Sequence, residues 1–118
     1  MDPRVQIVLN LIQERYRQEL TLQKLSEEVY LTREHLCRLF KAETGTSPAK
    51  YLKAFRLTKG KELLENTLMS VKEITHEVGV NDESHFVRDF KLVYGLTPTQ
   101  YRSRNFLANR IRVATNSA

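Results

Sequence analysis

The strongest constraint on the fold is an internal repeat with a period of about 50 residues. Residues 35–51 align with residues 85–101 at an offset of 50, with the identities His35/His85, Arg38/Arg88, Phe40/Phe90, Lys41/Lys91, Gly45/Gly95, Pro48/Pro98 and Tyr51/Tyr101. Residues 21–31 match residues 70–80 at an offset of 49, so the second copy has one extra residue in the turn near Asn81. Because a unit of roughly 50 residues is marginally stable alone, we expect one domain, or two very small ones that share an element.

Each copy has the pattern of a helix-turn-helix. Thr21 and Ser70 are residue types that cap helix starts, and Ser70 with Glu73 forms a capping box. A short helix follows in each copy, at about 22–29 and 71–78. After a tight turn, second helices begin at the caps Thr32 and Asp82 and end at the glycines Gly45 and Gly95. The sequence therefore predicts helix-turn-helix units at about 21–45 and 70–95.

Three further helices complete an all-α fold of about seven helices. The first starts at Asp2-Pro3 and is expected to bury Val5, Val8, Leu9, Ile12 and Tyr16. A connecting helix at about 48–66 starts at Ser47-Pro48, and a final helix at about 98–105 starts at Thr97-Pro98. The domain then covers 1–103, and 104–118 is a basic tail in which Leu107 and Ile111 are spaced for a short helical extension.

The two second helices carry matching polar faces. Leu36, Leu39 and Phe40 are expected in the core of the first unit, and Phe86, Phe90 and either Val93 or Tyr94 in the second. The opposite faces are Glu34, Cys37, Arg38 and Lys41, and Ser84, Val87, Arg88 and Lys91. An arginine at such a position can bind guanine in the major groove, and a lysine one turn later can reach a phosphate. One such stripe is usually a solvated surface, but its repetition favours DNA recognition.

The net charge agrees with an anionic partner. The chain has 19 Lys and Arg against 14 Asp and Glu, a formal charge of +5, and no acidic residue follows Asp89. This excess favours nucleic acid or an anionic membrane surface. No apolar run has the length of a membrane span, and the single cysteine, Cys37, excludes an internal disulfide. We therefore expect a cytoplasmic protein.

Two segments resemble a known family. Residues 74–102, ITHEVGVNDESHFVRDFKLVYGLTPTQYR, are similar to the signature of the AraC/XylS family of bacterial transcription regulators, and residues 25–52 resemble its first helix-turn-helix. The resemblance implies an all-helical domain that binds double-stranded DNA, with each second helix reading one of two adjacent major-groove segments. It favours activation through contact with RNA polymerase, and it leaves repression open.

The resemblance also implies which residues touch DNA. The base-contacting positions would be Arg33, Glu34, Cys37, Arg38, Glu83, Ser84, Val87 and Arg88. The positions next to the DNA backbone would be Thr21, Thr32, His35, Lys41, Ser70, Asn81, His85 and Lys91.

The sequence departs from the family pattern at three positions. Tyr30 stands where the family often has the glycine that Gly79 supplies in the second unit, so we expect backbone strain of about 1 kcal/mol there. Val80 stands where the family favours an aromatic residue, which predicts looser packing. Gly60 lies in the connecting helix where the family prefers alanine, so Gly60→Ala is expected to stabilise the protein by about 0.5–1 kcal/mol.

Other functions have weaker support in the sequence. His35 and Cys37 point away from each other on a helix and no other residues have metal-ligand spacing, so we expect neither a metal nor a cofactor. No constellation typical of catalysis is present, and no small-molecule site is expected in this segment. A helical-repeat module that binds proteins and not DNA remains the alternative. The sequence is compatible with a monomeric DNA-binding unit and with either a complete small regulator or the C-terminal part of a longer one.

Overall fold

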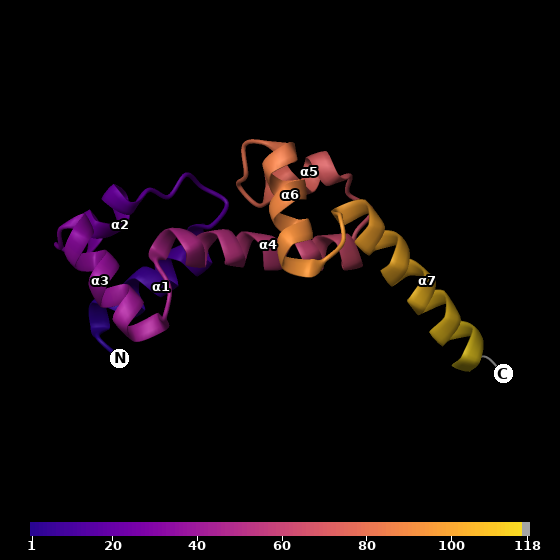
Figure 1. Cartoon of the computed structure of the whole chain (residues 1–118), viewed down its shortest axis with the longest axis horizontal. Helices are drawn as coiled ribbons and strands as arrows, with labels where there is room; N and C mark the ends of the chain where they lie inside the picture. The colour runs from indigo at the N-terminus through magenta and orange to yellow at the C-terminus, as the bar shows by residue number, and fades with distance from the viewer. Residues whose placement is uncertain (117–118) are drawn as a thin grey trace. The chain divides into compact units, whose positions relative to one another are not determined.

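The computed structural model describes residues 1–116, and side chains as far as residue 109. Over this range the chain is all-α, as predicted (Figure 1). It divides into two compact units, Met1–Arg56 and Leu57–Ala118, and the division falls inside one helix. The described helices are α1 (Pro3–Arg15), α2 (Leu22–Glu28), α3 (Arg33–Thr44), α4 (Pro48–Asn66), α5 (Val71–Glu77), α6 (Glu83–Tyr94) and α7 (Pro98–Asn116).

The first unit packs α1, α2, α3 and the beginning of α4 around one apolar cluster. Its buried members are Val5, Val8, Ile12, Leu25, Val29, Leu36, Phe40 and Leu52. Val5, Val8 and Ile12 lie on one face of α1 because they are spaced three and four residues apart. The predicted Leu9, Tyr16 and Leu39 are only partly buried at the edge of this cluster.

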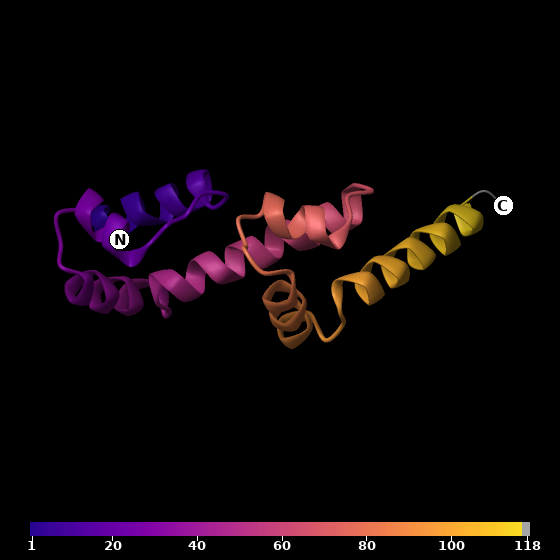
Figure 2. The ribbon, with the colours of Figure 1, turned by 90° about the horizontal axis from the view of Figure 1, so that it is seen from above.

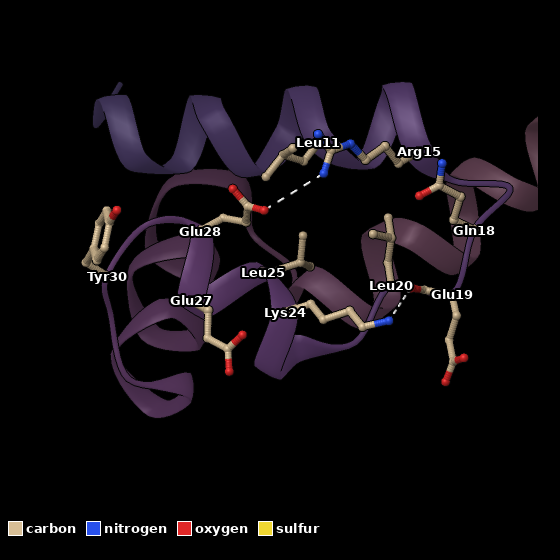
Figure 3. Close-up of a pocket in the computed structure, with 10 residues that line it drawn as sticks. All are labelled: Leu11, Arg15, Gln18, Glu19, Leu20, Lys24, Leu25, Glu27, Glu28 and Tyr30. Atoms are coloured by element: carbon tan, nitrogen blue, oxygen red, sulfur yellow. Dashed lines mark hydrogen bonds and ion pairs between the residues drawn. The ribbon is translucent and has the colours of Figure 1, made fainter.

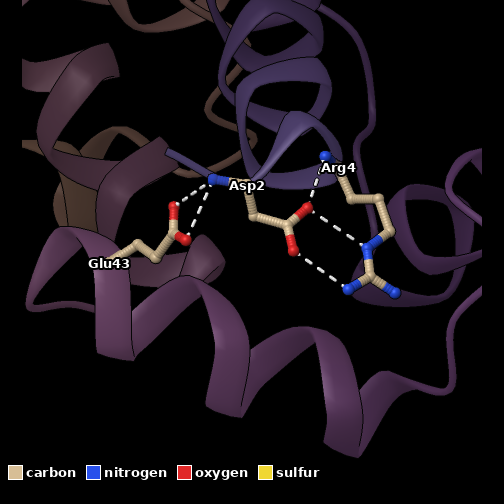
Figure 4. Close-up of polar contacts among 3 residues, drawn as sticks. All are labelled: Asp2, Arg4 and Glu43. Carbon is tan, nitrogen blue, oxygen red and sulfur yellow. Dashed lines mark hydrogen bonds and ion pairs between the residues drawn. The ribbon is translucent and has the colours of Figure 1, made fainter.

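The start of α1 is fixed by charged and polar contacts (Figure 4). Asp2 caps the helix: its Oδ1 accepts from the backbone N–H of Arg4 at 2.8 Å, and its other carboxylate oxygen pairs with the Arg4 guanidinium. The backbone N–H of Asp2 in turn lies 2.9 Å from both carboxylate oxygens of Glu43 in α3. The beginning of α1 is thereby attached to the end of α3.

The second unit repeats this construction. Its buried apolar side chains are Leu57, Leu64, Ile74, Val78, Phe86 and Phe90. Phe90 packs edge-on against Tyr101 with ring centroids 5.6 Å apart, as Phe40 packs against Tyr51 at 5.8 Å in the first unit. Over residues 32–50 and 82–100 the sequence of buried, half-buried and exposed positions is the same at every place. The repeat in sequence is therefore a repeat in three dimensions.

Helix boundaries follow the capping residues. Thr21, Thr32 and Ser70 each accept a hydrogen bond from the backbone N–H three residues later, and Ser70 forms the predicted capping box with Glu73. Ser47 and Thr97 do the same for α4 and α7. The second helices end where Gly45 and Gly95 adopt left-handed angles, with φ of 85° and 80°.

The turns between the helices of each unit begin with the same geometry, although the second turn is one residue longer. Tyr30 has φ of 56° and Gly79 has φ of 84°, and the amides of Leu31 and Val80 both bond to the carbonyl five residues earlier, at 3.0 Å. This is the Schellman pattern, whose left-handed position favours glycine. The left-handed angle on which the predicted strain at Tyr30 depends is confirmed. Figure 3 shows that the Tyr30 ring stands at the edge of a shallow groove on α1 and α2, away from the Arg15–Glu28 ion pair, and its side chain is 95% exposed.

Gly60 contradicts the sequence-based expectation. A Cβ at this position would lie 2.6 Å and 2.9 Å from two carbon atoms of the Phe86 ring, which is 1% exposed. A buried ring in a packed core cannot move aside without displacing its own neighbours. Gly60 is therefore present to let α4 approach α6 closely, and its replacement by alanine should destabilise the protein.

The structure decides one alternative that the sequence left open and corrects one prediction. Val93 is 60% exposed, and Tyr94 is the residue that packs against Phe90, with ring centroids 4.6 Å apart. The final helix continues to Asn116 and does not end near residue 105, as Figure 2 shows for α7. Residues 99–116 contain neither glycine nor proline, so nothing local stops the helix. The last two residues of the predicted tail, 117–118, lie outside the described part of the chain.

In both units an arginine holds the end of the first helix. The Arg56 guanidinium donates to the backbone carbonyls of Tyr16 and Gln18, at 2.8 Å each. Arg102 donates to the carbonyls of Leu64 and Thr67, at 3.2 Å each. Arg56 lies in the third turn of α4 and Arg102 in the second turn of α7, so the same contact is made from non-equivalent positions. These carbonyls lie at or just beyond a helix end, where no intrahelical N–H is left to donate to them.

Candidate nucleic-acid interface

Helix α3 presents the predicted polar face to solvent. Leu36 and Phe40 are fully buried beneath it, which fixes the rotation of the helix. Arg33, Glu34, Arg38 and Lys41 are exposed, and Cys37 is a half-buried free thiol between them. The side chain of Arg38 forms no hydrogen bond or ion pair with the described residues, so its guanidinium donors are available.

Helix α6 presents the equivalent face. Phe86 and Phe90 are buried, Glu83, Ser84, Arg88 and Lys91 are exposed, and Val87 is half-buried in the place of Cys37. Each face therefore has a polar residue in its first turn, then a small or apolar residue, then an arginine and a lysine. The spacing is i, i+3, i+4 and i+7 in both helices, which is the spacing of one helical face.

The second face has internal polar contacts that the first lacks. The Ser84 hydroxyl donates to Asp82 Oδ1 at 2.5 Å, and the same oxygen accepts from the backbone N–H groups of Ser84 and His85 at 2.8 Å and 3.3 Å. The bond from the Ser84 hydroxyl, with those from the two backbone amides, lowers the pKa of Asp82 below its usual value. The sequence predicts Asp82 as a helix cap but not its hydrogen bond with the Ser84 hydroxyl. The two-residue spacing of Asp and Ser at a helix start could have indicated this bond.

Arg88 also has a carboxylate neighbour. Its Nε lies 3.5 Å from Asp89 Oδ1, while the Arg88 side chain remains 61% exposed. The residue equivalent to Asp89 in the first unit is Leu39. The two arginines therefore have equivalent positions but different surroundings.

The predicted backbone-contacting residues surround these faces at the helix starts. The hydroxyls of Thr21, Thr32 and Ser70 accept from backbone N–H groups, which leaves each hydroxyl hydrogen free to donate to a phosphate oxygen. Asn81 and the imidazoles of His35 and His85 are exposed, and His85 Nε2 lies 4.0 Å from Asp82 Oδ2. Lys41 and Lys91 lie in the last turns of α3 and α6, where they are exposed.

This arrangement suits recognition of the base edges that DNA exposes in its major groove. An exposed helix with a guanidinium, a hydrogen-bond acceptor and a small apolar side chain on one face fits the donors, acceptors and methyl groups of the DNA major groove. Within residues 1–116 no helix is long and apolar enough to cross a membrane. The same part of the chain holds no group of three His, Cys, Asp or Glu residues arranged to bind a metal ion.

Comparison with known proteins identifies relatives over most of the chain. Residues 25–104 match the helix-turn-helix domain family. YdeC of Bacillus subtilis, an uncharacterised helix-turn-helix transcriptional regulator, is 30% identical over 102 residues, which are 86% of this chain and 35% of that protein. The lactose operon transcription activator of Staphylococcus xylosus is 28% identical over 106 residues, which are 90% of this chain and 38% of that protein. The chain thus spans little more than a third of the length of these relatives.

Solved structures share the fold. The C-terminal domain of AraT, a response regulator from Geobacillus stearothermophilus, superposes with a TM-score of 0.84 at 33% identity, covering 87% of this chain and 86% of that one. The DNA-binding domain of the transcriptional factor AdpA, solved in complex with a target DNA, gives a TM-score of 0.83 at 25% identity, covering 92% of this chain and 95% of that one. A transcriptional regulator from Chromobacterium violaceum with an AraC-type DNA-binding domain gives a TM-score of 0.80 at 27% identity, covering 87% of this chain and 92% of that one. The family match, the two helix-turn-helix units and these structures together show that the chain belongs to the AraC family of DNA-binding domains of transcription regulators.

Proposed function

We propose that α3 and α6 are the two recognition helices of this domain and that each reads one segment of the major groove of double-stranded DNA. The observation that carries the proposal is the shared exposed face, with an arginine at the same place and a lysine one turn later in both units. Exposed guanidinium and ammonium groups over buried apolar residues are suited to base and phosphate contacts.

We further propose that one chain binds as a monomer to two neighbouring segments of the groove. The connecting helix α4 has 19 residues and at about 1.5 Å per residue rises roughly 25–30 Å. Neighbouring major-groove segments on one side of B-DNA are about one turn, or about 34 Å, apart. The predicted base-contacting residues are Arg33, Glu34, Cys37, Arg38, Glu83, Ser84, Val87 and Arg88.

The regulatory outcome we propose is activation of transcription through contact with RNA polymerase. A relative of this chain is named as the lactose operon transcription activator, which supports activation over repression. We expect the protein to act on the nucleoid in the bacterial cytoplasm. Transcription from a promoter that carries the selected site, with purified polymerase and with or without the protein, measures the direction of the effect.

The experiment that tests DNA recognition is selection of binding sites from random duplex DNA, followed by affinity measurements at several salt concentrations. We expect an enriched sequence, a 1:1 complex in sedimentation, and a steep loss of affinity with salt because bound phosphates release counterions. A protein-interaction module would instead show no enriched sequence and a weak salt dependence. A 2:1 complex on a palindrome would contradict the monomer.

A further inference from the structure

The two recognition faces differ in sequence, but each presents a hydrogen-bond acceptor in its first turn and an arginine donor four residues later. Glu34 in the first turn of α3 is a carboxylate, which only accepts when ionised. Ser84 occupies the equivalent place in α6, and a free serine hydroxyl could donate as well as accept. Its single hydrogen is already directed to Asp82 Oδ1, at 2.5 Å. Toward a ligand, the Ser84 oxygen is therefore an acceptor only.

Asp82 is well placed to keep that hydrogen. Its Oδ1 receives the Ser84 hydroxyl and two backbone N–H groups, and these bonds favour the ionised carboxylate. An ionised carboxylate has no hydrogen to donate, so the direction of the Ser84–Asp82 bond is fixed. In the first unit the equivalent helix cap is Thr32, whose hydroxyl accepts from the amide of His35, and Glu34 requires no such partner to act as an acceptor.

We propose that Asp82 makes Ser84 an acceptor equivalent to Glu34, so that both recognition helices select the same class of base at that position. An acceptor in the major groove selects the amino groups of adenine (N6) or cytosine (N4), and it disfavours guanine and thymine, which offer acceptors there. One helical turn later, Arg38 and Arg88 select guanine in each half-site. This inference rests on the proposed DNA recognition and adds the base class at one position of each half-site.

The proposed half-sites are related elements and not identical ones. Between acceptor and arginine lie Cys37 and Val87, small side chains that can contact a thymine methyl group. The acceptor and the arginine are four residues apart, a rise of about 6 Å, so their bases are about one or two base pairs apart. Arg33 and Glu83 differ in charge at the preceding position, which makes the two half-sites distinguishable.

The test compares base preferences of the whole chain and of three variants, measured by selection and by affinity for single-base variants of the selected duplex. The Arg88→Ala variant first identifies the guanine of the second half-site. We expect adenine or cytosine within two base pairs of it, preferred over guanine and thymine by roughly 5- to 150-fold, the typical effect of one mismatched base pair. Ser84→Ala should remove this preference and leave unchanged the preference for the guanine that Arg88 contacts. Ser84→Glu should retain it, because a carboxylate is also an acceptor.

The Asp82→Thr variant isolates the role of Asp82. It copies the cap of the first unit, so α6 should still form, while the Ser84 hydrogen is released and the preference should broaden to include guanine or thymine. Three results would overturn the inference. The wild type could prefer guanine or thymine at this position, Ser84→Glu could reverse the preference for adenine or cytosine, or Ser84→Ala could leave that preference unchanged. Those results would leave DNA recognition intact, whereas the absence of any enriched sequence would overturn the proposed function as well.

Discussion

At the scale of single residues, Tyr30 combines an unfavourable backbone angle with a side chain that contributes little packing. Its φ is 56°, and the side chain is 95% exposed. A non-glycine residue in the left-handed region costs about 1–2 kcal/mol, although glycine loses more conformational entropy on folding. We predict that Tyr30→Gly raises the free energy of unfolding by about 1 kcal/mol, as measured by urea denaturation.

Two control variants separate strain from packing. Tyr30→Ala keeps the strained angle and should change stability by less than about 0.5 kcal/mol. Gly79→Ala introduces strain at φ of 84° and should destabilise the second unit. A large loss in Tyr30→Ala would show that the tyrosine ring stabilises the first unit, contrary to its exposure.

Gly60 gives a second prediction at this scale. The added Cβ of alanine would lie 2.6 Å from the ring of Phe86, so Gly60→Ala should lower the free energy of unfolding by about 1–3 kcal/mol despite the better helix propensity of alanine. A double-mutant cycle with Phe86→Leu is the control, because a smaller side chain leaves room for the Cβ. The loss caused by Gly60→Ala should be smaller in that background. Equal losses in both backgrounds would exclude the Phe86 contact as the cause.

At the scale of elements, the ends of α1 and α4 depend on arginines from later helices. Arg56 donates to the carbonyls of Tyr16 and Gln18, and burial lowers the pKa of its guanidinium. Removing it breaks two hydrogen bonds from a charged donor, so Arg56→Met should cost about 1–3 kcal/mol in urea denaturation. Arg56→Lys can restore one hydrogen bond, so its free energy of unfolding should lie between those of the wild type and Arg56→Met. If neither Arg56→Met nor Arg56→Lys changed the free energy of unfolding, these hydrogen bonds would contribute nothing measurable to stability.

The contact between α7 and α4 gives the second unit a response to alkaline pH. The Tyr101 hydroxyl donates to Glu65, and burial together with this carboxylate raises the pKa of Tyr101 to about 12 from its ordinary value of 10.0. Stability from the neutral phenol is fully present below pH 10 and is lost as the pH rises toward 12. Tyr101→Phe should flatten the decrease of the melting temperature between pH 10 and 12. Tyr30→Phe, at an exposed tyrosine, should leave that decrease unchanged.

The sequence predicts elements better than it predicts their contacts. Helix caps such as Thr32 and helix stops such as Gly45 act through contacts within four residues, so their roles can be predicted from the local sequence. The close approach of Gly60 to Phe86 and the Arg56 contacts join residues far apart in sequence, and no local pattern encodes them. For the candidate site, periodicity predicts which residues share an exposed face. The Ser84–Asp82 bond depends on side-chain orientation, which the Asp and Ser spacing suggests but does not fix.

At the scale of the whole molecule, duplication yields two units with one architecture and different surfaces. The exposure pattern is the same over 32–50 and 82–100, so equivalent residues are equally accessible. Arg38 is without a polar partner among the described residues, whereas Arg88 lies 3.5 Å from Asp89. A single chain with two unlike faces is expected to recognise an asymmetric site, and a palindrome would require two chains.

The last prediction assigns the halves of that site. Arg38→Ala should relax base preference in one half and Arg88→Ala in the other, about 10 base pairs apart, each at a cost of about 1–3 kcal/mol for the selected duplex. The matched variants Lys41→Ala and Lys91→Ala should weaken all duplexes alike and reduce the salt dependence, because a phosphate contact carries no sequence information. Sites selected separately for each variant provide the measurement. If both arginine variants relaxed the same base positions, α3 and α6 would not read separate segments, and the proposed arrangement would be wrong.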